Sequence, residues 1–158
     1  MLYCKLLGAG VLLCCGLAVS VSAVALLQRR VQQTEGFLAL LAALREQIDR
    51  YATPLRGALR ALDPRLLAAC GIRGQIETPE ALLTAAPLYL SREAAEALEL
   101  FARDAQGASR EELLRRCDAA SERLRLYHEA ARRTLPRERQ AAFFLPLAAA
   151  AALALLLL

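Results

Sequence analysis

Lysine, histidine, glycine, proline and aromatic residues are scarce in this sequence, and several of these shortages exclude a class of function. Lys5 is the only lysine, so the chain has no P-loop and cannot bind a nucleotide by that route. His128 is the only histidine, and the five cysteines form no Cys-x-x-Cys pair, so neither a zinc site nor a disulfide framework is indicated. The motifs GxSxG, HExxH and GxGxxG are missing as well. We therefore predict a protein that is not an enzyme and has no cofactor and no metal site.

Charge is missing from both ends of the chain. No charged residue lies in 6–27 or 141–158, whereas all sixteen acids and nineteen of the twenty basic residues lie in 28–140. A helix needs roughly 20 apolar residues to cross ~30 Å of hydrocarbon, and both runs fall in or near that range. Strand-like alternation is absent too. The sequence predicts an all-α protein with an N-terminal transmembrane anchor (1–27), a helical domain (28–140) and a C-terminal transmembrane helix (141–158).

A cleaved signal peptide is the alternative for the first apolar run, because Ala23-Val24-Ala25 matches an A-x-A cleavage pattern. The run is longer than the roughly 7–15-residue apolar core of a signal peptide. In addition, Arg29 and Arg30 follow it at once. Both features favour an uncleaved anchor.

Four small residues on one face of the first run form a candidate packing surface in lipid. They lie four residues apart and are Gly10, Cys14, Ala18 and Ser22. Small residues let a second helix approach closely inside a membrane. The alternative is that they share one face by chance.

The arginines that flank the two runs predict the orientation in the membrane. Arg29 and Arg30 follow the first run, and four arginines precede the second, namely Arg132, Arg133, Arg137 and Arg139. Because basic flanks stay in the cytoplasm, we predict that 28–140 is cytoplasmic and that both termini lie on the far side.

The middle segment has the periodicity of amphipathic helices. Two apolar stripes, one before residue 52 and one after residue 109, repeat at spacings of three and four residues. The first contains Phe37, Leu41, Leu44, Ile48 and Tyr51, and the second contains Leu113, Cys117, Ala120, Leu124, Tyr127 and Ala131. We expect two long helices that continue into the two spans, with Leu44 and Leu124 facing the same interior.

Short helices are expected between these two, each opened by a capping pattern. The patterns are Thr53-Pro54, Asp63-Pro64, Thr78-Pro79, Ser91, and a capping box made by Ser109 and Glu112. Together they predict a bundle of about six cytoplasmic helices. The cysteines are expected to be small buried hydrophobic residues, and His128 an ordinary surface or boundary residue.

Several short motifs follow one another in a defined order. The chain starts with Lys5-Leu6-Leu7-Gly8-Ala9, continues with Leu44-Arg45-Glu46-Gln47-Ile48-Asp49 before Thr53-Pro54-Leu55, and later contains Phe101-Ala102, Arg110-Glu111-Glu112 and Arg116-Cys117-Asp118. In these motifs and in its segment order, the whole chain resembles the stage III sporulation protein AB family of endospore-forming bacteria. It departs from that family at Arg45 and Gln47, where members often have glutamates.

The resemblance implies a fold like the cytoplasmic domain of the inner-membrane platform protein of type II secretion and type IV pilus systems. It also implies a place in the mother-cell membrane that faces the forespore, within a secretion-like complex. The implied partners are a cytoplasmic ATPase and other membrane subunits of that complex. The expected function is a non-enzymatic platform that couples the ATPase to the membrane assembly. The alternative is a membrane-anchored regulator or sensor with a helical interaction domain.

The Arg/Glu-rich segment 110–133 is the candidate docking surface for the ATPase. The arginines expected to contribute most are Arg115, Arg116 and Arg123. The alternative is an ordinary solvated helix face with ion pairs three and four residues apart. Nucleic acid is not an expected partner, because acids are interleaved with the arginines throughout.

Overall fold

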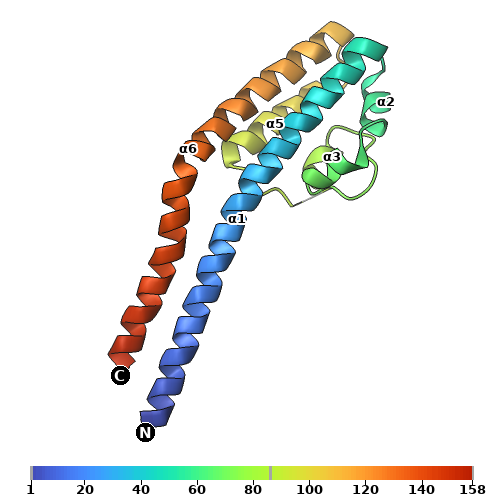
Figure 1. Cartoon of the computed structure of the whole chain (residues 1–158). Helices are drawn as coiled ribbons and strands as arrows, with labels where there is room; N and C mark the ends of the chain where they lie inside the picture. Colours follow the sequence, from blue (N-terminus) through green and yellow to red (C-terminus); the bar gives the residue numbers. More distant parts are fainter. Residues whose placement is uncertain (1, 86, 158) are drawn as a thin grey trace. The chain divides into compact units, whose positions relative to one another are not determined.

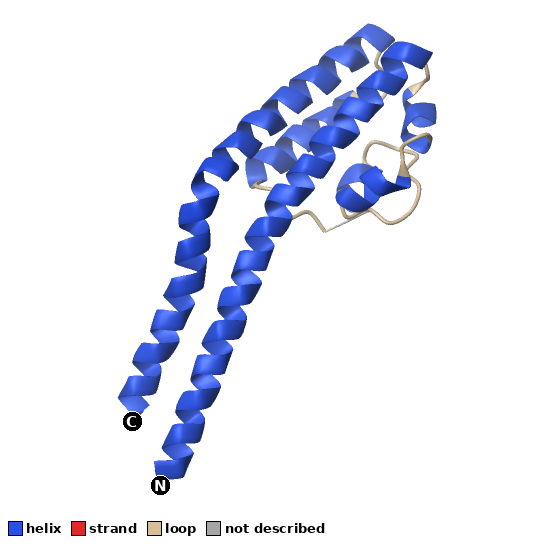
Figure 2. Cartoon of the chain, viewed as in Figure 1, coloured by secondary structure: helices blue, strands red, loops and turns tan. Residues whose placement is uncertain are grey.

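The protein is all-helical in the computed structural model, which describes the backbone of residues 2–85 and 87–157 and the side chains of 7–85 and 87–156. Helices make up 81% of the structure, and no strand occurs in the part described (Figure 1, Figure 2). The helices are α1 (Leu2–Tyr51), α2 (Leu55–Arg60), α3 (Pro64–Ala69), α4 (Ala81–Thr84), α5 (Arg92–Asp104) and α6 (Arg110–Leu157). The all-α prediction is confirmed. The side chains of Cys4 and Lys5 lie outside the described residues.

The chain divides into two compact units, and α1 and α6 contribute to both. The apolar unit contains Met1–Arg29 and Arg132–Leu158, and the core unit contains Arg30–Ala131. As predicted, the two long helices run without interruption from the apolar runs into the core unit, and α6 stays helical through Pro136 and Pro146. The predicted domain limits, after residues 27 and 140, follow hydropathy and differ from these unit limits.

Both ends of the chain qualify as membrane spans by length and composition. α1 and α6 each contain an 18-residue stretch that is apolar enough to cross a membrane, and 11% of each stretch is buried within the protein. A core helix of a soluble protein would be mostly buried. The large exposed side chains of these stretches, Leu7, Val11, Leu145 and Leu155 among them, therefore suit a lipid environment.

Within the apolar unit, α1 packs against α6 through small residues. A Cβ added to Gly16 would lie 2.5 Å from the Cβ of Ala150 and 3.3 Å from the carbonyl oxygen of Pro146, so the helices approach closely because this position is glycine. Ser20, one turn further on, is fully buried and its hydroxyl donates to the Gly16 carbonyl at 2.8 Å. A serine hydroxyl inside a helix can bond back to the carbonyl four residues earlier in this way.

The predicted packing face of α1 is not the face that contacts α6. Its four residues are all exposed, namely Gly10, Cys14, Ala18 and Ser22. At 3.6 residues per turn, this face lies roughly half a turn around the helix from Gly16 and Ser20. Both faces have small residues at a spacing of four, and the side chains of α6 select the one that is used. A role of the exposed face toward a second chain stays a prediction.

The hydrophobic core lies in the core unit, where the two predicted stripes meet. Phe37, Leu41 and Leu44 are fully buried, and Leu124 is fully buried in the same cluster. Leu44 and Leu124 thus face one interior, as predicted. Two residues of the stripes, Tyr51 (66%) and Tyr127 (37%), are exposed instead and do not belong to this cluster.

Capping decides where the short helices begin, and the predicted starts are correct at two of four. Asp63 accepts a hydrogen bond from the Arg65 N–H at 2.8 Å, and Ser91 accepts one from the Ala94 N–H at 3.3 Å. The Thr53-Pro54 prediction is one residue early, because Pro54 has an extended ψ of 150° and serves as the N-cap.

The third short helix also begins later than predicted from Thr78-Pro79. Hydrogen bonds from the Ala81 N–H to the Thr78 carbonyl and from the Leu82 N–H to the Pro79 carbonyl, both 3.1 Å, close a tighter turn first. Such i→i+3 bonds are typical of a 3₁₀ turn that leads into an α-helix. The helix α4 itself starts at Ala81.

A buried glutamine joins α1 to two loops of the core unit. The Gln33 amide nitrogen donates to the carbonyls of Cys70 (2.8 Å) and Pro87 (3.0 Å), and its oxygen accepts from the Tyr89 N–H at 2.7 Å. One turn on, a Cβ at Gly36 would lie 2.9 Å from the backbone of Ala69. The absence of a side chain at Gly36 therefore lets this loop approach α1 closely enough for the Gln33 bonds.

Candidate functional site

A shallow groove between α5 and α6 lies on the surface of the core unit. Its lining residues are Ala97, Leu100, Phe101, Asp104, Arg116, Ala119, Ala120 and Arg123, and its volume is about 200 Å³. Pockets for small molecules usually measure about 300–1,000 Å³. The smaller groove suits one or two side chains of a protein partner better than a cofactor.

Two of the three predicted arginines line this groove, and the third does not. Arg116 and Arg123 lie two turns apart on α6, with Leu100 of α5 on the opposite wall. The side chain of Leu100 is 44% exposed and therefore offers a partner an apolar contact near the two arginines. The sequence pattern missed it because it lies outside the inward stripe of α5.

The other predicted residues contact one another around the first turn of α6. The Ser109 hydroxyl accepts a hydrogen bond from the Glu112 N–H at 3.3 Å, which is the forward half of the predicted capping box. The Glu112 carboxylate pairs with Arg115 and, at 3.0 Å, with Arg116. These two guanidinium groups hold the pKa of the Glu112 carboxyl below its usual value. The second half of the capping box is therefore replaced by ion pairs along α6.

Arg123 differs from its two neighbours, because it forms no ion pair within the described part of the chain. It is exposed on α6, and the acid in the groove lining is Asp104 of α5. An exposed guanidinium without an intramolecular partner retains its five N–H donors for another molecule. Among the predicted arginines, Arg123 is thus the one best placed for a partner.

An ion pair and hydrogen bonds also connect α1 to α6 within the core unit. Arg45 Nε lies 2.6 Å from Asp118 Oδ1, and this contact raises the pKa of the Arg45 guanidinium. Arg110 donates to the carbonyls of Ile48 at 3.2 Å and Asp49 at 2.6 Å. These bonds satisfy carbonyls in the last turn of α1, which ends before Ala52 adopts a φ of +48°.

The remaining reactive side chains are placed unfavourably for chemistry. Burial raises the pKa of the Cys70 and Cys117 thiols to about 12, so both stay protonated at neutral pH and are poor nucleophiles. Both are buried, as predicted, whereas Cys14 and Cys15 are exposed on α1, which contradicts the prediction for them. His128 is a boundary residue, with Nε2 3.3 Å from a Glu35 oxygen and a buried Nδ1 without a partner in the described part.

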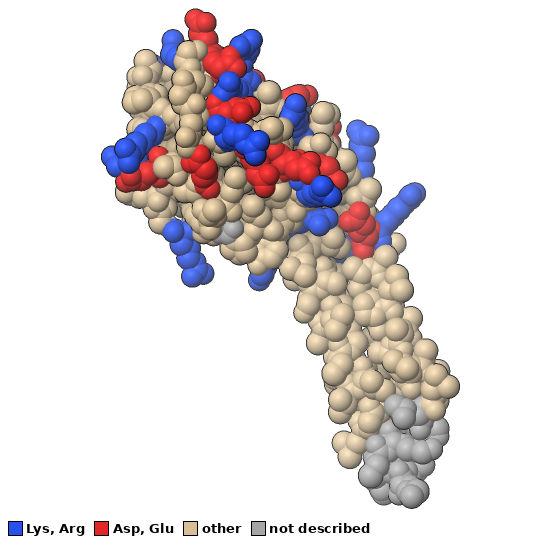
Figure 3. All heavy atoms as spheres, turned by 180° about the vertical axis from the view of Figure 1, so that it is seen from behind, with Lys and Arg blue, Asp and Glu red and all other residues tan. Residues whose placement is uncertain are grey.

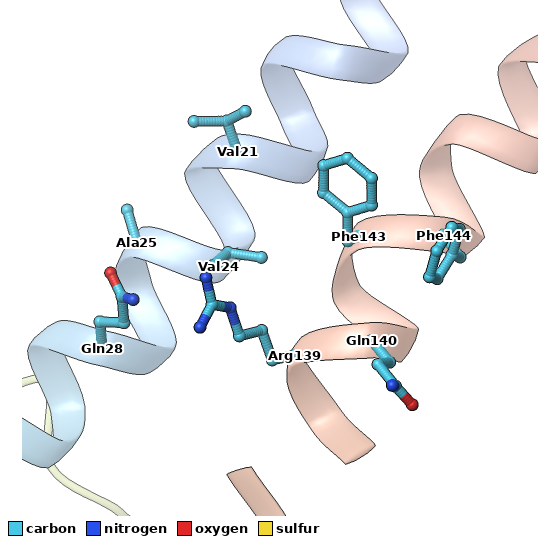
Figure 4. A pocket seen from close by; sticks show the side chains of 8 residues that line it. All are labelled: Val21, Val24, Ala25, Gln28, Arg139, Gln140, Phe143 and Phe144. Atoms are coloured by element: carbon cyan, nitrogen blue, oxygen red, sulfur yellow. The ribbon is translucent and has the colours of Figure 1, made fainter. Parts of the chain in front are cut away.

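A second groove lies in the apolar unit between α1 and α6 (Figure 4). It measures about 460 Å³ and is lined by Val21, Val24, Ala25, Gln28, Arg139, Gln140, Phe143 and Phe144. Sequence reasoning did not find it, because it depends on which residues of two distant segments lie opposite each other. The only hint was the change from apolar to basic residues near positions 28 and 140.

The surface of the core unit is densely charged, with both signs intermixed. Figure 3 shows Lys/Arg and Asp/Glu side chains alternating over it, while the described atoms on the apolar stretches of α1 and α6 show none in that view. Many of these charges pair locally, such as Arg56 and Arg60 with Glu77 at 2.9 and 2.8 Å. Such a surface suits a protein partner with its own mixed charges.

Among the residues whose side chains the structure describes, 7–85 and 87–156, no group of three or more His, Cys, Asp or Glu residues is arranged to hold a metal ion. No protein-family model, curated protein or solved structure matches the chain.

Proposed function

We propose that this chain is a non-enzymatic platform subunit that couples a cytoplasmic ATPase to a membrane assembly. The proposal combines the sequence resemblance to stage III sporulation protein AB with the scarcity of groups able to perform chemistry. In this account the chain lies in the mother-cell membrane facing the forespore. The core unit faces the cytoplasm, and both termini lie on the far side.

The continuity of α1 and α6 is the observation that carries the proposal. Each helix has an apolar stretch suited to lipid and continues without a break in its helical backbone into the core unit. A stiff helix transmits a displacement along its axis, whereas a flexible linker would absorb it. A protein that passes motion from a motor to a membrane complex needs such a connection.

The groove between α5 and α6 is the proposed docking site for the ATPase. It presents Arg116 and Arg123 around the exposed apolar side chain of Leu100. An apolar contact surrounded by charges is typical of transient protein interfaces, in which the charges mainly steer association. A predicted six-helix bundle in the cytoplasm would present this groove to such a partner.

The proposal is tested by measuring binding between the full chain in detergent micelles and the ATPase of the same complex. Binding should weaken as salt rises, because exposed charges are screened over about 10 Å at 0.1 M salt. Reversing Arg115, Arg116 and Arg123 to Glu should weaken it further while helicity stays unchanged. Arg123→Glu alone is the cleanest variant, because Arg123 gives up no ion pair in the described structure.

The matched control is Arg73→Glu, which makes the same charge change at an exposed loop residue outside the groove. It should leave the dissociation constant nearly unchanged. Equal weakening by Arg73→Glu and Arg123→Glu would move the docking surface elsewhere. Absence of binding by a folded chain would reject the platform role and favour the membrane-anchored regulator. The purified chain should also hydrolyse no ATP by itself.

A further inference from the structure

The groove in the apolar unit changes character along its length. α1 and α6 run antiparallel there, since Gly16 lies against Ala150 and Val21 shares the groove with Phe143. One end of the groove is therefore lined by Val21, Phe143 and Phe144. The other end is lined by the polar side chains Gln28, Arg139 and Gln140.

Arg139 extends across the polar end of this groove. In Figure 4 its side chain points from α6 toward Val24 and Gln28 of α1, while Gln140 and Phe144 project from another side of α6. Arg139 is exposed and has no ion-pair partner within the described residues. Its guanidinium is thus a positive charge without an ion-pair partner among the described residues, beside the apolar end of the groove.

The apolar unit that contains this groove has an excess of arginine. The apolar unit contains five arginines in its described side chains, at positions 29, 132, 133, 137 and 139, and Glu138 is its single acid. An anionic ligand is therefore favoured at the polar end. An aliphatic group is favoured at the other end, where the walls are valine and phenylalanine.

We infer that this groove binds one anionic phospholipid, with the phosphate on Arg139 and an acyl chain along Val21, Val24 and Phe143. The inference rests on the membrane location in the proposed function. The groove has apolar walls toward the hydrocarbon, and amides and a guanidinium at the headgroup level. Basic residues at this level attract anionic lipids, and arginine binds phosphate through two parallel N–H donors.

A phospholipid explains these features better than a second protein helix would. A helix docking in the groove would need a partner for the Arg139 charge and would bury Gln28 and Gln140 without replacing their water contacts. A phosphate accepts hydrogen bonds from Arg139 and Gln28, which lie on the same side of the groove in Figure 4. The volume, about 460 Å³, holds a headgroup phosphate and the upper part of one chain.

The experiment uses the absence of tryptophan from the chain. A Phe144→Trp variant of the full chain, reconstituted in bilayers, has one fluorophore in the groove wall. Its quenching is compared between brominated phosphatidylglycerol and brominated phosphatidylcholine at equal mole fraction. We expect about fivefold stronger binding of the anionic lipid, the factor that corresponds to ~1 kcal/mol for one basic residue at a membrane surface.

The matched variants are Arg139→Gln and Arg137→Gln, each added to Phe144→Trp. Both remove one exposed arginine of α6, and only Arg139 lines the groove. The preference should disappear with Arg139→Gln, remain with Arg137→Gln and largely remain with Arg139→Lys. An equal loss with Arg139→Gln and Arg137→Gln would overturn the inference, since it would indicate general attraction of anionic lipids to a basic surface.

Two further outcomes separate this inference from the proposed function. Equal quenching by both lipids would overturn the lipid site and leave the membrane location intact. No quenching by either lipid, in a chain that resists carbonate extraction, would indicate that another helix fills the groove. That result would also overturn the lipid site. A chain released by carbonate would contradict the membrane location itself.

Discussion

The two units of this protein bury opposite kinds of side chain. In the core unit the buried residues are large and aliphatic, such as Leu44 and Leu124, and the charged residues lie outside. In the apolar unit the buried residues are small, such as Gly16, Ser20 and Ala150, and large residues such as Leu145 are 70% exposed. Water drives large apolar side chains inward, whereas in lipid close helix contact depends on small side chains.

This contrast predicts that the two units are sensitive to different kinds of substitution. A change of size or polarity inside the core unit should destabilise it through cavities, clashes or unpaired polar groups. Added bulk in the apolar unit should matter only where α1 touches α6.

The largest effect is expected when a charge is placed in the aliphatic core. Leu44→Asp or Leu124→Asp buries a carboxylate without a partner, which should cost more than about 4 kcal/mol and unfold the core unit. The fragment 28–140 contains the entire core cluster, so its thermal unfolding can be followed by circular dichroism. Arg45→Ala is the control and should shift the melting temperature little, because Arg45 and Asp118 are both exposed. Similar shifts for all three variants would refute the packing described here.

A smaller loss is expected at the buried glutamine. Gln33→Leu removes three hydrogen bonds, to Cys70, Pro87 and Tyr89, and should destabilise the core unit by about 3 kcal/mol. Gln32→Leu makes the same change at an exposed position of α1 and should have an effect below about 0.5 kcal/mol. Urea denaturation of the fragment 28–140 measures both. If Gln33→Leu lowered the stability as little as Gln32→Leu, the hydrogen bonds between Gln33 and the two loops would not exist in solution.

The smallest effect concerns the contact between the spans. Gly16→Ala places a methyl group on Ala150 and should force the helices apart, at a cost of about 1–3 kcal/mol. Gly10→Ala is the matched control, because no atom lies within 4 Å of an added Cβ there. Thermal unfolding of the full chain in micelles should show a lower midpoint for Gly16→Ala alone. A larger loss at Gly10 would instead support the face first predicted from sequence, through contact with a second chain.

The sequence was sufficient where periodicity and capping chemistry determine the structure. The stripes of Leu44 and Leu124 place the core, because a spacing of three and four residues has one helical solution. Asp63 and Ser91 fix helix starts through short-range hydrogen bonds. These features depend on a few neighbouring residues and are therefore visible in the sequence.

Features that join distant segments could not be predicted in this way. Gln33 lies in a polar run, and nothing local distinguishes it from Gln32, although it is buried against loops 37 to 56 residues away. Likewise, the choice between two small-residue faces of α1 depends on where Ala150 lies. Both grooves arise from the same cause, because Arg123 and Arg139 acquire their neighbours only when α5 or α1 packs against α6.

We propose that α1 and α6 each cross a membrane once, with the core unit on the cytoplasmic side. The direct measurement is a pair of fusions to a reporter that is active only outside the cytoplasm. Fused after Gly107, in the connection between α5 and α6, the reporter should be silent, and fused after Leu158 it should be active. Activity after Gly107 with silence after Leu158 would contradict the account.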